Sequence, residues 1–192
     1  MTRIPSLVFA ALSAVPAVVF AQAAAAPSPV AATAAANPIS ASQNKMYTML
    51  SGVIVTAAEK MPEENYSFKP SPDVRTFGQL VGHLADSQFY FCSLATGGTK
   101  PASSAEKTKT GKADLIAALK EAVAYCRDAS ATMTDAKGGE TVKLMGTDFA
   151  RLMVLAANTA HDYEHYGNMA TYMRIKGIVP PTSEKSSAPE QK

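Results

Sequence analysis

Three histidines are the residues of this sequence best suited to chemistry, and they are the only histidines among its 192 residues. His161 and His165 are four positions apart, so on a helix both side chains project from one face and can reach a single ion. His83 lies in a separate apolar segment, on the same helical stripe as Leu80 and Leu94. We expect the three imidazoles to meet in a helical core as ligands of a divalent metal ion.

Three imidazoles that leave one position open are typical of catalytic zinc, so we expect Zn²⁺, with Ni²⁺ and Fe²⁺ as alternatives. A single histidine on an apolar face is more often a core residue than a ligand, but all three here fall on inward stripes. The catalytic residues themselves are unknown. Asp86, Asp162 and Glu164 could orient an imidazole or accept a proton, and Asn168 and Tyr172 share the helical face of the histidine pair.

The run His161-Asp162-Tyr163-Glu164-His165 is also similar to the H-E-x-x-H motif of zinc proteases, in which a glutamate after the first histidine acts as general base. Asp162 takes that place here, and its side chain is one methylene shorter. No residue downstream of the pair stands out as a third ligand. A protease of that type is therefore disfavoured.

Four segments with helical periodicity must position these residues, and little of the chain alternates like a strand. The predicted helices cover residues 40–60, 76–95, 113–133 and 147–177. The last is predicted to begin at Thr147 as N-cap and to end at Gly177. Residues 99–112 are predicted to form a loop, and residues 141–144 a short extended piece. We predict an all-α fold, a four-helix bundle over residues 40–179, with up-and-down or crossover connections.

The N-terminus is similar to an export signal. Arg3 precedes an uncharged apolar stretch that ends at Phe20, and Ala21-Gln22-Ala23 offers an A-x-A cleavage site. The predicted segments outside the bundle are a signal peptide at residues 1–23, an Ala/Pro-rich linker at residues 24–39 and a disordered tail at residues 180–192. We expect a periplasmic or secreted protein without stable membrane association after cleavage, with an uncleaved anchor as the alternative.

Cys92 and Cys126 are the only cysteines of the chain. In an oxidising compartment they could form a disulfide, and the alternative is two small buried thiols. Cys92 lies nine residues after His83, about half a turn round the helix, so we exclude it as a metal ligand. The formal net charge is +2 and the basic residues are scattered, so no nucleic-acid partner is expected.

Two runs of residues resemble the DinB-like superfamily. The first is Gly82-His83-Leu84-Ala85-Asp86, and the second is His161-x-x-x-His165-Tyr166-Gly167-Asn168, followed by Tyr172-Met173-Arg174. The resemblance covers about residues 44–181. It implies a four-helix bundle whose metal is held by one histidine of the second helix and a pair from the fourth, here His83, His161 and His165. Many relatives carry Gln at the position of Asn168.

The best understood relatives are cytosolic transferases that use low-molecular-weight thiols such as bacillithiol or mycothiol, whereas this chain is predicted to be exported. We expect a metal-dependent hydrolase or thiol-type transferase that acts on an unidentified small molecule through a metal-bound water or thiolate. The alternatives are a non-catalytic metal-binding or stress-associated helical module, and an interaction bundle without metal. Family members are often homodimers, and Val55 or Met169 could be exposed for such a contact.

Overall fold

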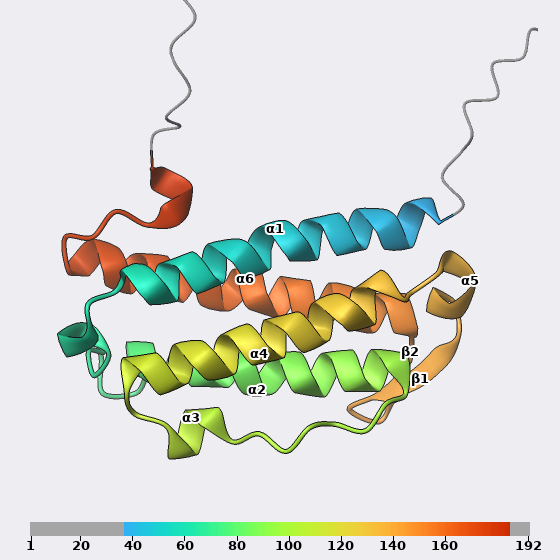
Figure 1. The fold of residues 1–192 in the computed structure, drawn as a ribbon, viewed down its shortest axis with the longest axis horizontal. Helices are drawn as coiled ribbons and strands as arrows, with labels where there is room; N and C mark the ends of the chain where they lie inside the picture. Colours follow the sequence, from blue (N-terminus) through green and yellow to red (C-terminus); the bar gives the residue numbers. More distant parts are fainter. Residues whose placement is uncertain (1–36, 185–192) are drawn as a thin grey trace, which may run out of the picture. The chain divides into compact units, whose positions relative to one another are not determined.

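The computed structural model describes residues 37–184, which are mostly helical (Figure 1). Its elements are the helices α1 (Pro38–Lys60), α2 (Phe77–Thr96), α3 (Ala105–Thr108), α4 (Lys112–Ala131), α5 (Asp135–Gly138) and α6 (Arg151–Ile175), the strands β1 (Thr141–Leu144) and β2 (Thr147–Ala150), and the 3-10 helices η1 (Glu63–Asn65) and η2 (Pro181–Ser183). The predicted four-helix bundle is confirmed by α1, α2, α4 and α6. Within residues 37–184, no helix has the length and apolarity needed to cross a membrane. The predicted signal peptide and nearly all of the predicted linker lie outside the described residues.

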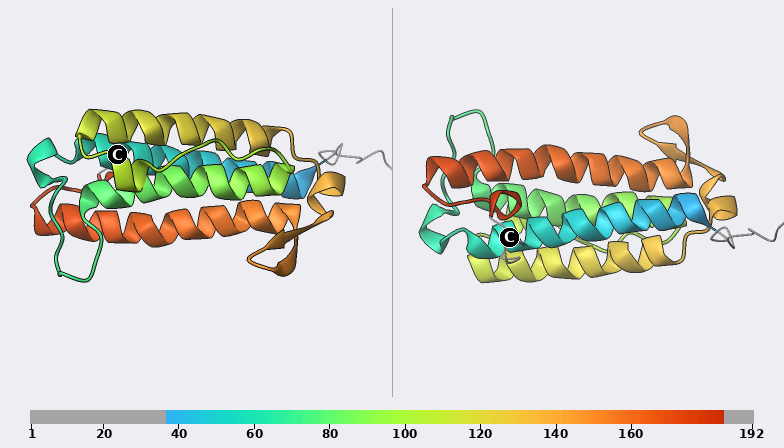
Figure 2. Two further views of the ribbon diagram at one scale, coloured as in Figure 1. Left: turned by 90° about the horizontal axis from the view of Figure 1, so that it is seen from below. Right: turned by 90° about the horizontal axis from the view of Figure 1, so that it is seen from above.

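The four long helices pack side by side, and α1 and α2 each contact both α4 and α6. Figures 1 and 2 show that α2 and α4 run in the same direction, and that α1 and α6 both run in the opposite direction. The connection from α2 to α4 therefore returns along the length of the bundle. Of the two topologies that the sequence allowed, the structure has the crossover form.

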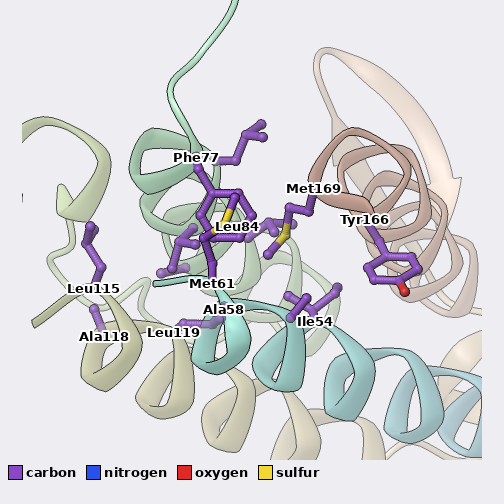
Figure 3. Packing of buried hydrophobic residues seen from close by; sticks show 14 of the residues in the cluster. Ile54, Ala58, Met61, Phe77, Leu84, Leu115, Ala118, Leu119, Tyr166 and Met169 are labelled. Carbon is purple, nitrogen blue, oxygen red and sulfur yellow. The ribbon is translucent and has the colours of Figure 1, made fainter. Parts of the chain in front are cut away.

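The core lies between the four helices and holds large apolar side chains from each of them. Ile54, Leu84, Leu119 and Met169 come from different helices and are fully buried, and Figure 3 shows Met169 among its core neighbours. The prediction that Met169 could be exposed for a dimer contact was wrong, because this side chain fills the interior of the bundle. Val55 is partly buried and packs against the same core.

Helix α2, which carries His83, begins where the sequence predicts. The Thr76 hydroxyl accepts a hydrogen bond from the backbone N–H of Gln79, and the Gln79 side chain accepts one from the backbone N–H of Thr76. This reciprocal cap satisfies two of the N–H groups that a helix start leaves free. The helix ends at Gly97, whose φ of 74° is readily adopted only by glycine.

The predicted start of the fourth helix at Thr147 was wrong. Residues 141–144 are extended as expected, but Thr147 begins a second strand that pairs with them, and α6 starts only at Arg151. Met145 and Gly146 form the turn between the strands and have φ angles of 51° and 84°, as tight hairpin turns require. The charge of Asp148 pairs with Lys143 across the hairpin and does not lie in the first turn of α6.

A disulfide joins Cys92 of α2 to Cys126 of α4, with their Cα atoms 5.3 Å apart. Both residues are fully buried in a second apolar cluster with Tyr47, Val154 and other residues. Of the two alternatives for these cysteines, the structure has the disulfide. It ties together the two parallel helices on either side of the long crossover connection.

The first residues of the predicted disordered tail are ordered. Pro181–Ser183 form a 3-10 helix, and Thr182 hydrogen-bonds to the Tyr166 hydroxyl of α6 at 2.8 Å. Glu184 forms an ion pair with Lys60 at the end of α1. Residues 185–192 of that tail lie outside the described residues.

Candidate metal centre

The three histidines meet between α2 and α6. Nε2 of His161 lies 3.1 Å from Nε2 of His83 and 3.1 Å from Nε2 of His165. One ring nitrogen of each histidine lies within 4.8 Å of those of the other two. The predicted convergence of side chains that are 78 residues apart in the sequence is therefore present in the fold.

The spacing and the protonation state of these nitrogens both fit a divalent ion. Two zinc–nitrogen bonds of about 2.1 Å at a tetrahedral angle hold their nitrogens about 3.4 Å apart, close to the 3.1 Å between Nε2 of His161 and Nε2 of each of the other two histidines. Burial, followed by the charges that His165 and His83 would carry, lowers the pKa of His161 to about 4. Burial likewise lowers the pKa of His165. Both rings are thus neutral near pH 7, which is the form that binds metal.

Hydrogen bonding between the rings alone does not satisfy this cluster. A single N–H on Nε2 of His161 can serve only one of its two neighbours, so the other contact would bring ring nitrogens together without a proper bond. In addition, Nδ1 of His161 is buried and has no hydrogen-bond partner among residues 37–184. A cation between the three nitrogens would remove the conflict at Nε2. The donor set therefore suits a metal ion better than it suits a plain core.

A glutamate that the sequence analysis missed fixes the orientation of His83. Glu106 Oε2 accepts a hydrogen bond from Nδ1 of His83 at 3.0 Å, and its Oε1 accepts one from Nε of Arg75 at 2.8 Å. Although partial burial raises it, the hydrogen bonds from Arg75 and His83 lower the pKa of Glu106 overall. Because an ionised carboxylate only accepts, His83 must carry its proton on Nδ1, and its Nε2 lone pair faces the other histidines.

A pocket of about 620 Å³ opens beside the histidines, between α6 and the segment that leads into α2. Its wall includes His165, Glu106 and Arg75, together with polar and charged side chains on both sides. The remaining lining residues are Lys69, Pro72, Asp73, Val74, Gln79, Leu80, Glu164, Asn168 and Tyr172. This volume is typical of a site for a small molecule.

Three of the predicted neighbours of the metal lie on this pocket. Asn168 places its amide 3.5 Å from Nδ1 of His165, so its oxygen can accept that N–H when the amide is turned. Glu164 is exposed on the pocket wall. The Tyr172 hydroxyl donates to the backbone oxygen of Arg75 at 2.9 Å, which ties α6 to the start of α2. The roles predicted for Asn168 and Glu164 are compatible with their positions. Tyr172 instead hydrogen-bonds to Arg75 of the pocket wall.

Asp162 does not orient an imidazole, contrary to the prediction. It is fully buried, and both of its oxygens accept from the side-chain amide of Gln88, at 2.9 and 2.8 Å. The Gln88 oxygen in turn accepts from Asn158 at 2.7 Å and from Tyr47 at 3.1 Å. Burial raises the pKa of Asp162 to about 7, although Gln88 lowers it. Asp162 thus belongs to a buried polar network that links α1, α2 and α6.

Asp86 also makes no hydrogen bond to an imidazole. Its carboxylate accepts from the backbone N–H groups of Ala105 and Glu106, at 2.8 and 3.1 Å, and from the hydroxyl of Ser103. The segment that it binds was predicted to be a loop, and it contains the four-residue helix α3. The sequence offered no signal for this contact, because neither periodicity nor spacing relates Asp86 to residues in the crossover connection.

The comparisons with known proteins agree with the fold of the bundle. Two solved structures of DinB-like proteins share the fold. One, from Bacillus subtilis, has a TM-score of 0.62 and 21% identity over 76% of this chain and 99% of its own. The other, from Bacillus cereus ATCC 10987, has a TM-score of 0.63 and 16% identity over 71% of this chain and 92% of its own.

No curated protein matches this chain. The family model of the DinB superfamily, however, matches residues 51–169, which is more than half of the sequence and includes His83, His161 and His165. The two solved structures show the same fold over most of the chain. The chain therefore belongs to the DinB superfamily.

Proposed function

We propose that this chain is an exported protein that binds Zn²⁺ through His83, His161 and His165 and uses it in hydrolysis or in thiol transfer. The observation that carries the proposal is the convergence of three ring nitrogens within 4.8 Å beside an open pocket. Zinc held by three protein ligands lowers the pKa of a coordinated water to about 7 and so supplies a nucleophile at neutral pH. Membership of the DinB superfamily supports metal binding by the bundle.

The residues around the histidines have separate tasks in this proposal. Glu106 holds His83 with its Nε2 lone pair directed at the other rings. Glu164 lies on the same pocket as His165, so its carboxylate can accept a proton from a nucleophile bound there. The pocket walls bind and orient the substrate, and their volume favours a small molecule over a polymer.

Export is supported by two features that are far apart in the sequence. Residues 1–23 have the pattern of a signal peptide, and the Cys92–Cys126 disulfide is typical of oxidising compartments. We expect a protein expressed from the full gene to be recovered from the periplasm with its N-terminus at Ala24. N-terminal sequencing of that fraction checks this. Recovery in the cytosol with residues 1–23 still attached would contradict export.

The catalytic part of the proposal is tested with the mature protein, residues 24–192, loaded with zinc. A panel of chromogenic esters and phosphates and a panel of electrophiles with added thiols separate hydrolysis from thiol transfer. We expect turnover to be lost in His161→Ala and to persist in Thr171→Ala, an exposed position of the same helix. Turnover that survives in metal-free His161→Ala would reject a metal-dependent reaction. A zinc-loaded protein that turns over nothing in either panel would favour the non-catalytic module, in which the ion ties α2 to α6.

A further inference from the structure

We propose that residues 103–108 of the crossover connection are a positioning element of the metal centre, and that Asp86 acts on His83 through them. This segment, here called the strap, contains α3 and carries Glu106. The inference rests on the proposed metal site, because it explains how one ligand of that site is oriented. It assigns to the strap a role that neither the family match nor the sequence pattern gives it, and it makes the action of Asp86 on His83 indirect.

The bundle topology brings the strap to the metal centre. Because α2 and α4 run in the same direction, the chain must travel back along α2 before α4 can begin (Figure 1). The returning chain packs on α2, and α3 contacts that helix. A connection of this length could cross the surface at many positions. The structure therefore needs specific contacts that decide which strap residue lies behind His83.

Asp86 supplies the first of these contacts. One oxygen of its carboxylate accepts the N–H of Ala105 and the other accepts the N–H of Glu106. A helix of four residues is not stable by itself, because too few hydrogen bonds offset the entropy of ordering its backbone. The N–H groups of Ala105 and Glu106 have no partner within α3, because they lie in its first turn, and Asp86 satisfies both. Asp86 thus anchors the strap at the residue whose side chain reaches His83.

Gly82 allows the second contact, in which the backbone of the strap lies against α2, because it has no side chain. A Cβ atom at this position would lie 2.6 Å from Cα and 2.7 Å from N of Glu106. The backbone of the strap can rest directly on α2 only because Gly82 leaves this space free. Gly82 and Asp86 are four residues apart, so they lie on one face of α2 and hold the strap over two successive turns.

The consequence is a defined position for the Glu106 carboxylate. It receives the Nδ1–H of His83 at 3.0 Å and the Nε–H of Arg75 at 2.8 Å. The first bond fixes the tautomer and the ring plane of His83, so that Nε2 is free for the ion. Asp86 does not touch the imidazole. It is a positioning residue that acts through the strap and through Glu106.

A double-mutant cycle tests this chain of contacts. Zinc affinity is measured by competition with a chromophoric chelator. The proteins compared are the mature wild type, Glu106→Ala, Asp86→Ala and the double variant. Asp128→Ala, which removes an exposed carboxylate on α4, is the control. Each single variant should lose about 10- to 100-fold in affinity, which is usual when the partner of a ligating histidine is removed. The double variant should lose no more zinc affinity than the more affected single variant, because both substitutions remove the same hydrogen bond between Glu106 and His83. Losses that multiply in the double variant would show that Asp86 acts by another route and would overturn the proposal.

A second readout needs no metal. In the metal-free protein near pH 8, ¹⁵N chemical shifts of the imidazoles report which nitrogen of His83 carries the proton. We expect Nδ1–H in the wild type, loss of this preference in Asp86→Ala and Glu106→Ala, and its retention in Glu106→Gln, whose amide oxygen can still accept. A wild type that binds no zinc would refute the proposed function and leave this test in place. An unchanged His83 tautomer in Asp86→Ala would refute the role of the strap.

Discussion

Removing the metal should lower the melting temperature of the mature protein by roughly 12 °C. An ion that binds only the folded state at a free concentration a thousand times its Kd contributes about 4 kcal/mol to the free energy of unfolding. For a domain of this size each kcal/mol corresponds to about 3 °C. The effect is expected here because His83 lies on α2 and the other two ligands on α6, so the ion joins two helices that are separate in the sequence. Differential scanning calorimetry with zinc and with chelator measures it.

His161→Ala is the matched control for this prediction. The variant should melt at the same temperature with zinc and with chelator, because two remaining histidines bind the ion weakly. Its melting temperature should lie somewhat below that of the chelated wild type, because the substitution also removes the contacts of Nε2 with His83 and His165 and the packing of the ring against Phe91. A wild type whose melting temperature does not respond to chelation would contradict the prediction.

Reducing the disulfide should lower the free energy of unfolding of the metal-free protein by about 4 kcal/mol, as much as removing the metal does. Cys92 and Cys126 are 34 residues apart, and a cross-link that closes a loop of this length stabilises by about 4 kcal/mol, chiefly by restricting the unfolded chain. The enclosed loop includes the whole crossover connection and therefore the strap. Urea unfolding with and without a phosphine reductant measures the loss as a lower midpoint. The slope should rise on reduction, because the unfolded chain without the cross-link exposes more surface.

The variant Cys92→Ala/Cys126→Ala distinguishes the cross-link from the packing of its sulfur atoms. It should be at least as unstable as the reduced wild type, because both cysteines are fully buried and their replacement also leaves space in the core. It should not respond to the reductant. Equal midpoints for the oxidised and reduced wild type would show that the bond does not stabilise the fold and would contradict the prediction.

The sequence predicted the parts of this fold that depend on one helix at a time. Helical periodicity located both ends of α1, α2 and α4 to within two residues. The same periodicity placed all three histidines on inward faces. Because all helices of a bundle share one core, the inward position of all three imidazoles predicted that they would lie close together.

Features that depend on several segments together could not be predicted in this way. The hairpin before α6 takes its form from a two-residue turn with positive φ angles and from strand pairing, so Thr147 resembled an ordinary helix cap. Glu106 lies in a polar stretch without periodicity, and only the crossover topology brings it to His83. Asp162 follows a metal-binding candidate in the sequence but points to Gln88, because successive residues on a helix face different directions.

Elemental analysis of the purified mature protein is the most direct test of the metal centre. The protein should be made without a histidine-containing tag, separated from free ions by gel filtration and compared with His83→Ala prepared in the same way. We expect about one divalent ion per wild-type chain, as a single three-histidine site requires, and only background metal in the variant. A folded wild type that retains no ion after incubation with zinc, or a His83→Ala variant that retains as much as the wild type, would contradict it.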